Sequence, residues 1–398
     1  MKSVFDQELV SLLRGYLLES EEVRISDDVS LITCAQKHSL VGIAAHLAAQ
    51  DPRLEAQKRR YYAGVELSVI QRSCEQDFAF LQITGVFEEK GIPYLPVKGY
   101  RIRQAYPIPE LREMGDFDIV IHPADRERVA GTFAEMGYQR KNTFQEVDEY
   151  INDVANFEIH TVLFPSIVRQ HEPCGEWLTH GLWEQAQQQG DSMQYLLSRQ
   201  TELILMFLHM ASHFYFGSCG LRFFFDIAVY EKAFRAQIDW QAAASTLQRL
   251  GFETFFRYSM TVTHRWFGMP LPACVQEFDF PESQKVERII WEGGTFGYLG
   301  RSDAARTMKT VLTHKNAKGR PGKLLRETLF LPASQWNERY PYLRRCPILY
   351  PVAFTHRAFT WAYKQYRQNG VTAGVRQLSS EKREIAEEIK LLHKIGLD

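Results

Sequence analysis

The sequence predicts an α+β protein in which a small β-sheet core lies between an N-terminal helical segment and a larger C-terminal helical domain. Two observations support this prediction. Strand-like and helix-like stretches alternate clearly only between residues 91 and 165, whereas apolar residues before and after recur at the three- and four-residue spacing of helices. We therefore expect a helical segment at residues 1–90, an α/β core at 91–165 and a helical domain at 166–398.

The N-terminal segment is expected to be a helical scaffold. Apolar residues between Leu9 and Leu17 fall on one helical face, and Leu40–Ala49 is an alanine-rich stretch typical of a helix. A longer helix is expected from Leu54 to Glu89, where Gly91 and Pro93 provide a stop signal.

The core is expected to begin with a strand at Tyr94–Val97 that ends in the turn Lys98-Gly99. A short helix should follow and end near Pro107 and Pro109, because the residue before a proline avoids helical geometry. The remaining expected elements are a strand at Phe117–Ile121, a helix at Ala124–Met136 ended by Gly137, a strand at Tyr138–Lys141 and a strand at Phe157–Leu163.

The C-terminal part carries helical spacing in several stretches and one loop signature. Asn316, Gly319 and Pro321 predict a loop at Val311–Lys323, inside the basic segment 301–326. The expected helices are Glu202–Phe214, Leu221–Phe234, Trp240–Leu250, Val286–Trp291 and Ala353–Tyr366.

Composition excludes several classes of function. The net charge is −1, so we do not expect stable binding of nucleic acid by the molecule as a whole. The six cysteines are scattered without a Cys-x-x-Cys pair, which argues against a zinc site and fits a reducing compartment. No uncharged apolar run reaches the roughly 20 residues that span a bilayer, and no signal peptide is recognisable, so we expect a cytoplasmic protein without a transmembrane segment.

The most informative motif is Gly115-Asp116-Phe117-Asp118, followed by Ile119-Val120-Ile121. Side chains alternate along a strand, so Asp116 and Asp118 should share one face while Phe117 and Ile119 point into a core. Two carboxylates about 7 Å apart are unfavourable unless a cation lies between them. Mg²⁺ prefers such oxygen ligands and commonly acts on substrate phosphates.

The strand expected at Phe157–Leu163 also carries polar residues, in the sequence Asn156-Phe157-Glu158-Ile159-His160. Glu158 and His160 should share its polar face, so Glu158 is a further carboxylate to consider beside Asp116 and Asp118. His160 is either part of the site or a hydrogen-bonded structural histidine. Rival carboxylates are Asp148, Glu149 and Asp153, which lie in a less regular segment.

The ordered set of Lys98-Gly99, Arg112, Gly115-Asp116-x-Asp118 and Glu158-x-His160 resembles the bacterial uncharacterised nucleotidyltransferase family. That family belongs to the DNA polymerase beta-like nucleotidyltransferase superfamily. The resemblance covers residues 98–160 and continues more loosely in 208–226 and 324–340. It implies a mixed β-sheet of the nucleotidyltransferase type. Lys98-Gly99 stands where the superfamily usually has Gly-Gly or Gly-Ser.

The resemblance implies transfer of a nucleotide monophosphate from a nucleoside triphosphate, most simply ATP, to an acceptor, with release of pyrophosphate. Mg²⁺ or Mn²⁺ would be held by Asp116, Asp118 and Glu158, which would also be the catalytic residues. The acceptor is a small molecule, sugar, peptide or protein. The residues expected to contact the nucleotide are Lys98, Gly99, Arg112, Gly115 and His160.

Several assignments have alternatives. Arg112 should bind phosphate or pair with the metal-binding carboxylates, and Lys98 should add charge at the phosphates or be a solvated surface residue. The helix residues His209, His213, Arg222 and Asp226 either line the active-site cleft or form a buried polar network.

Two non-enzymatic functions are alternatives. A catalytically degenerate protein would bind a nucleotide or a protein partner without turnover. An RNA- or membrane-associated helical adaptor would use the basic, aromatic segment 342–366.

Overall fold

The computed structural model describes residues 4–19, 25–144, 147–163, 177–178, 181–217, 219–295, 349, 351–353, 355–356 and 384–397. The chain divides into two compact units: residues 1–214 with 218–297, and residues 215–217 with 298–398. Most of the helix expected at Ala353–Tyr366, the loop at Val311–Lys323 and the basic segments 301–326 and 342–366 lie outside the described residues. The three-part division at residues 90 and 165 stays a prediction.

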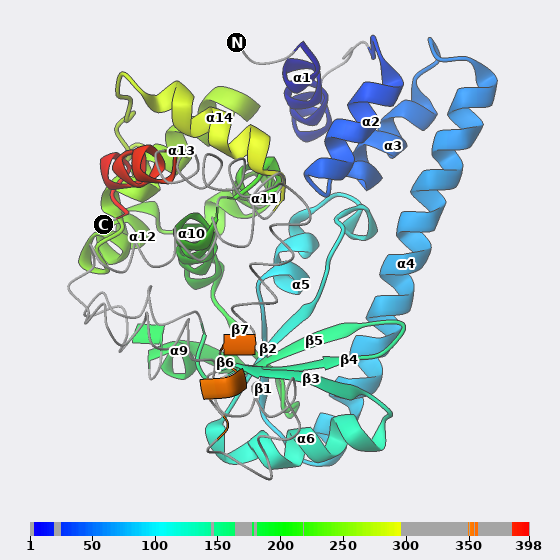
Figure 1. Cartoon of the computed structure of the whole chain (residues 1–398), viewed down its shortest axis with the longest axis vertical. Coiled ribbons are helices and arrows are strands. Elements are labelled where there is room, and N and C mark those ends of the chain that lie inside the picture. Colours follow the sequence, from blue (N-terminus) through cyan, green and yellow to red (C-terminus); the bar gives the residue numbers. More distant parts are fainter. Residues whose placement is uncertain are drawn as a thin grey trace. The chain divides into compact units, whose positions relative to one another are not determined.

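A five-stranded mixed sheet forms the centre of the first unit (Figure 1). Its strands lie in the order β1-β2-β5-β4-β3, and β2 and β5 are parallel while every other neighbouring pair is antiparallel. The mixed sheet confirms the α+β prediction. The strands are β1 (Tyr94–Val97), β2 (Phe117–Ile121), β3 (Gln139–Phe144), β4 (Val147–Ile151) and β5 (Asn156–His160).

Strand β4 corrects the expectation of a less regular segment around Asp148. Its burial alternates, so that Asp148 and Tyr150 are buried on the same face as Phe157 and Ile159 of β5. The Asp148 carboxylate is tolerated there because Arg126 and Arg140 both donate to it. Asp148 therefore cannot be a metal ligand on the opposite face.

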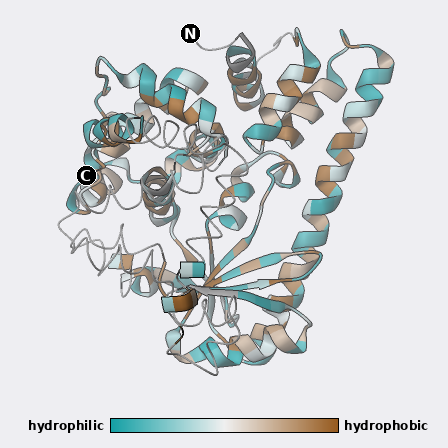
Figure 2. Cartoon of the chain, in the orientation of Figure 1, coloured by the Kyte–Doolittle hydropathy of each residue, from teal (hydrophilic) through white to brown (hydrophobic). Residues whose placement is uncertain are grey.

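One face of the sheet packs against helices α4 (Ala56–Glu89) and α6 (Arg126–Glu135). Phe117 and Phe157 stack with ring centroids 5.1 Å apart, and Phe133 of α6 stacks on Tyr150 at 4.2 Å. Each buried aromatic side chain contributes about 1.5–3 kcal/mol. Both helices carry hydrophilic and hydrophobic residues, as expected for helices with one buried face (Figure 2). This core leaves the opposite face of β2 and β5 for polar residues.

The N-terminal helices follow the predicted pattern, with one addition. Helix α2 was not predicted separately and begins at a cap, because Asp27 accepts a hydrogen bond from the backbone of Ser30. The buried Asp28 of α2 then binds Lys58 and Tyr62 of α4. The helices are α1 (Val4–Leu18), α2 (Asp28–Lys37), α3 (Val41–Gln50) and α4.

The connections in the core are short. After β1 the chain forms α5 (Gly99–Ile102) and the 3₁₀ turns η1 (Arg103–Ala105) and η2 (Pro109–Leu111). The turn η3 (Pro123–Asp125) leads into α6, which ends before Gly137 at φ +79° as predicted.

The helical part after the core begins with α9 (Gly181–Glu184) and the unpredicted hairpin β6–β7 (Ala186–Gln188 and Tyr195–Leu197). The four helices predicted between Glu202 and Trp291 are present, and α13 is an addition. No described helix has the length and apolar character needed to cross a membrane. The remaining elements are α10 (Arg199–Phe216), α11 (Leu221–Phe234), η4 (Arg235–Gln237), α12 (Trp240–Arg249), α13 (Glu253–Phe267) and α14 (Ser283–Gly293). Residues 384–394 are also helical.

Candidate active site

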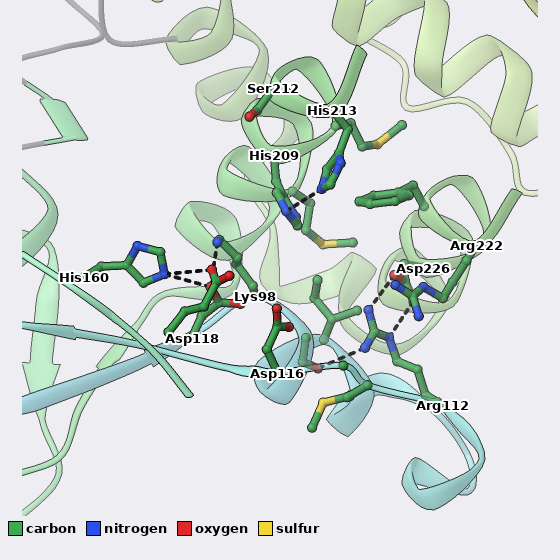
Figure 3. Close-up of a pocket in the computed structure, with 18 of the residues that line it drawn as sticks. Lys98, Arg112, Asp116, Asp118, His160, His209, Ser212, His213, Arg222 and Asp226 are labelled. Atoms are coloured by element: carbon green, nitrogen blue, oxygen red, sulfur yellow. Dashed lines mark hydrogen bonds and ion pairs between the residues drawn. The ribbon is translucent and has the colours of Figure 1, made fainter. Parts of the chain in front are cut away.

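The carboxylates singled out in the sequence meet on the polar face of β2 and β5. Asp118 lies between Val97 of β1 and Glu158 of β5 in the strand register, while Phe117 and Ile119 point into the core. Asp116 precedes the strand and lines the same pocket as Asp118 (Figure 3). Glu158 is thus adjacent to Asp118, as expected for a third ligand.

Three of these side chains form a group that could hold a metal ion. One ligand atom each from Asp118, Glu158 and His160 lies within 4.8 Å of the other two. Carboxylate oxygens are the ligands that Mg²⁺ prefers, so the donor set fits a hard divalent cation. Asp116 is not part of this close group but lines the adjoining pocket wall.

Lys98 lies at the centre of the site rather than on a solvated surface. Its Nζ is 2.6 Å from Oδ1 of Asp118, and its side chain is only 11% exposed. Burial alone would lower the pKa of Lys98, but the charges of Asp118 and Glu158 raise it, so the amine is protonated. The ammonium therefore already neutralises one carboxylate of the candidate metal site.

The backbone of Lys98 adopts a conformation that favours glycine. Its φ is 51° and its ψ is −128°. Such a conformation costs a residue with a Cβ atom about 1–3 kcal/mol and persists where surrounding contacts enforce it. It places the lysine directly after β1, beside Asp118 on β2.

His160 supports Asp118 from the other side. Burial and the charge of Lys98 lower the pKa of His160, so the imidazole is neutral at pH 7. Because the Asp118 carboxylate can only accept, His160 Nε2 carries the hydrogen and donates it over 2.8 Å. Nδ1 of His160 has no hydrogen-bond partner among the described residues.

The three carboxyl groups differ in acidity. Burial alone would raise the pKa of Asp118, but Lys98 and His160 hold it well below its ordinary value. Burial and the charge of Asp118 raise the pKa of Asp116 to about 6, and the same two causes raise the pKa of Glu158. The site accumulates more negative charge than Lys98 alone can balance, as a cation site requires.

Gly99 and Gly115 both border the pocket. A Cβ atom on Gly99 would lie 3.2 Å from Nη1 of Arg112 and 3.4 Å from Sδ of Met114, so the position is crowded. Gly115 is exposed and has open space around it. Helix α5, which begins at Gly99, is a single turn, so its dipole adds little attraction for a phosphate group.

Arg112 does not pair with Asp116 or Asp118. Its Nε and Nη2 donate to the two oxygens of Asp226 on α11, each over 2.7 Å, and the Tyr106 hydroxyl donates to the same carboxylate over 2.6 Å. Arg112 and Asp226 are both buried. Asp226 is therefore bound by Arg112 and not by Arg222, which lies four residues before it on the same helix. Tyr106 was missed because nothing near it in the sequence indicates a partner.

Arg222 is a second buried arginine in the pocket wall. It is 9% exposed, its Nη1 donates to the Glu113 carbonyl over 3.1 Å, and its Nε has no partner among the described residues. Burial and the neighbouring Arg112 lower its pKa. Because Asp226 is held by Arg112, this corner of the pocket carries net positive charge and suits an anionic group.

Helix α10 supplies the wall across the pocket from Asp118 (Figure 3). His209 and His213 are joined Nε2 to Nε2 over 2.9 Å and both lie against Phe223. Burial lowers the pKa of both histidines, to about 3 for His213, so they are neutral at pH 7. The cavity has a volume of about 350 Å³, which falls within the range of small-molecule sites.

Two arginines that follow Gly99 and the rival carboxylates Glu149 and Asp153 do not line the pocket. Arg101 is bound to Glu202 and Arg103 to Asp77, so neither is available to phosphate. Glu149 accepts from Asn156 at the edge of the site, and Asp153 is exposed.

Comparison with known proteins identifies one family. The family model described as an uncharacterised nucleotidyltransferase matches residues 26–268, which is more than half of the chain. Searches of curated proteins and of solved structures each found no significant match.

Proposed function

The chain belongs to the uncharacterised nucleotidyltransferase family, and from this premise we propose that it moves a nucleotide monophosphate from a nucleoside triphosphate, most simply ATP, to an acceptor and releases pyrophosphate. One observation carries the proposal. Asp118 and Glu158 are register partners on parallel strands and share a pocket with Asp116.

Asp116, Asp118 and Glu158 would hold Mg²⁺ or Mn²⁺. Such an ion, when bound, neutralises charge on the phosphates and on the leaving pyrophosphate. Burial and the charge of Asp118 raise the pKa of Asp116 and of Glu158, and a bound cation would stabilise their charged forms. His160 positions Asp118 through its hydrogen bond.

The triphosphate would lie toward Gly99, Gly115 and Arg222. The glycines permit close approach of the backbone, and Arg222 offers an Nε–H that has no partner in the described part of the chain. Arg112 would fix the position of the pocket wall beside Arg222, because its guanidinium donates to both carboxylate oxygens of Asp226. Lys98 would add positive charge to the site from its ion pair with Asp118. Catalysis then comes from positioning and charge neutralisation.

The acceptor would enter between the carboxylates and α10. Ser212 and the neutral pair His209 and His213 line this side, next to the ring of Phe223. Glu158 is placed to take the acceptor proton, because its raised pKa suits a general base near neutral pH. These features suit a small molecule, sugar, peptide or protein side chain with a nucleophilic oxygen or nitrogen.

A second candidate function is binding of a nucleotide without turnover. The ion pair between Lys98 and Asp118 favours it, because the ammonium competes with a metal ion for the same carboxylate. A basic adaptor for RNA or a membrane would depend on segments outside the described residues. A cytoplasmic location is proposed from the scattered cysteines of the sequence, which include no Cys-x-x-Cys pair.

Pyrophosphate release tests the proposal. The purified protein is incubated with Mg²⁺ or Mn²⁺, each of the four NTPs and pooled acceptors, and nucleotide binding is measured separately by calorimetry. Asp118→Asn should abolish release, whereas the exposed Asp153→Asn should not. Binding of nucleotide without pyrophosphate release under any condition would reject transfer in favour of the binding function.

A further inference from the structure

The feature that carries a further inference is the lysine among the metal-binding carboxylates. Among the described residues outside glycine, positive φ occurs at Glu19, Ser39 and Lys98. Of these, Lys98 is the residue whose side chain enters the candidate active site. An unfavourable backbone conformation at such a place indicates that the position of the side chain matters.

The contacts of Lys98 are those of a metal ion rather than of a surface lysine. The ammonium is 2.6 Å from Oδ1 of Asp118, which also accepts from His160, and it is attracted by Glu158 and Asp116. Figure 3 shows Lys98 and His160 both reaching Asp118. The same ammonium is enclosed by the sheet and the pocket wall, so little solvent screens its charge.

We propose that Lys98 is a resident cation that takes the place of one of two divalent ions, so that the nucleotide binds with a single divalent ion between Asp116 and Asp118. This inference rests on the proposed function. Two cations bound to one carboxylate repel each other strongly in a buried site. Lys98 therefore keeps the site partly neutralised before the substrate arrives and disfavours a second ion between Asp118 and Glu158.

The test counts Mn²⁺ ions. Free Mn²⁺ is measured by electron paramagnetic resonance during titration of the protein saturated with an ATP analogue whose α–β bond cannot be cleaved. The proteins are the unmodified chain, Lys98→Met, and Lys90→Met as a control, since Lys90 pairs with Glu135 away from the site. If Lys98→Met does not fold, Lys98→Gly serves instead, because glycine also relieves the backbone conformation.

The unmodified chain and Lys90→Met should bind one Mn²⁺ per nucleotide. Lys98→Met should bind two, with the first ion held at least about tenfold more tightly. Its melting temperature should be low without metal and should recover in Mn²⁺, whereas that of the unmodified chain should change less.

Three results would overturn the inference. Two Mn²⁺ ions in the unmodified chain, or equal stoichiometry and affinity with and without Lys98, would overturn it and leave the proposed function intact. Absence of Mn²⁺ binding in every protein would overturn both.

Discussion

Replacing Asp226 with alanine should strongly destabilise the protein, because this carboxylate compensates buried positive charge. Asp226 is 3% exposed and Arg112 is 6% exposed. Three hydrogen bonds reach Asp226: two come from Arg112 and one comes from Tyr106. Its removal leaves the guanidinium of Arg112 uncompensated close to that of Arg222.

The expected magnitude follows from these contacts. Breaking a buried ion pair by removing one partner costs about 3–5 kcal/mol, and the stranded Tyr106 hydroxyl adds about 1 kcal/mol. Domains are commonly stable by only about 5–15 kcal/mol. The variant should therefore lose a large part of the free energy of unfolding.

Urea unfolding followed by far-UV circular dichroism measures this loss. Asp239→Ala is the control, because Asp239 only caps α12 by accepting from Ala242, and such a cap contributes about 1 kcal/mol. The double variant Arg112→Leu with Asp226→Leu should lose less than the sum of its single variants, since no charge is left unpaired. A loss below about 1 kcal/mol in Asp226→Ala would refute the assignment of a buried, compensating pair.

Three further outcomes are expected. Asp118→Asn should weaken Mn²⁺ binding about 100-fold or more, because it removes a negative ligand; calorimetry giving an unchanged affinity would exclude Asp118 as a ligand. Because the pKa of Asp116 is raised to about 6, protons should compete with metal below that pH, and Mn²⁺ affinity should fall by up to about tenfold per pH unit between pH 6 and 5. Titrations at pH 5, 6 and 7.5 check this, and a pH-independent affinity would contradict it. Gly99→Val should weaken nucleotide binding about tenfold by crowding the pocket beside Arg112, whereas Gly85→Ala, in open space on α4, should leave it unchanged in the same fluorescence titration.

Strand periodicity allowed half of the site to be predicted. Phe117 and Ile119 are apolar on either side of Asp118, so the side of β2 that carries Asp118 could be inferred from the sequence, and so could the polar face of Glu158. The neighbouring positions of the two strands were implied by the family resemblance, and the structure has them in register.

The other half depends on partners that are distant in the sequence. In the sequence, the charged Asp148 is typical of a loop, because its partners Arg126 and Arg140 meet it only in the folded chain. Strand β4 was therefore not predicted. Arg112 and Asp226 are 114 residues apart, so no local pattern indicates their pairing. The conformation of Lys98 is equally hidden, because sequence patterns predict glycine at positive φ.

The parallel pairing of β2 with β5 also has a consequence for the order in which the site assembles. β1 and β2 are antiparallel and joined by residues 98–116, a shorter segment than residues 122–155 between β2 and β5, so Lys98 can reach Asp118 earlier in folding. β5 can pair with β2 only after the chain has passed through α6, β3 and β4 and has closed that longer loop. Glu158 then approaches a carboxylate whose charge a lysine already balances, so the last strand joins the sheet with less electrostatic repulsion.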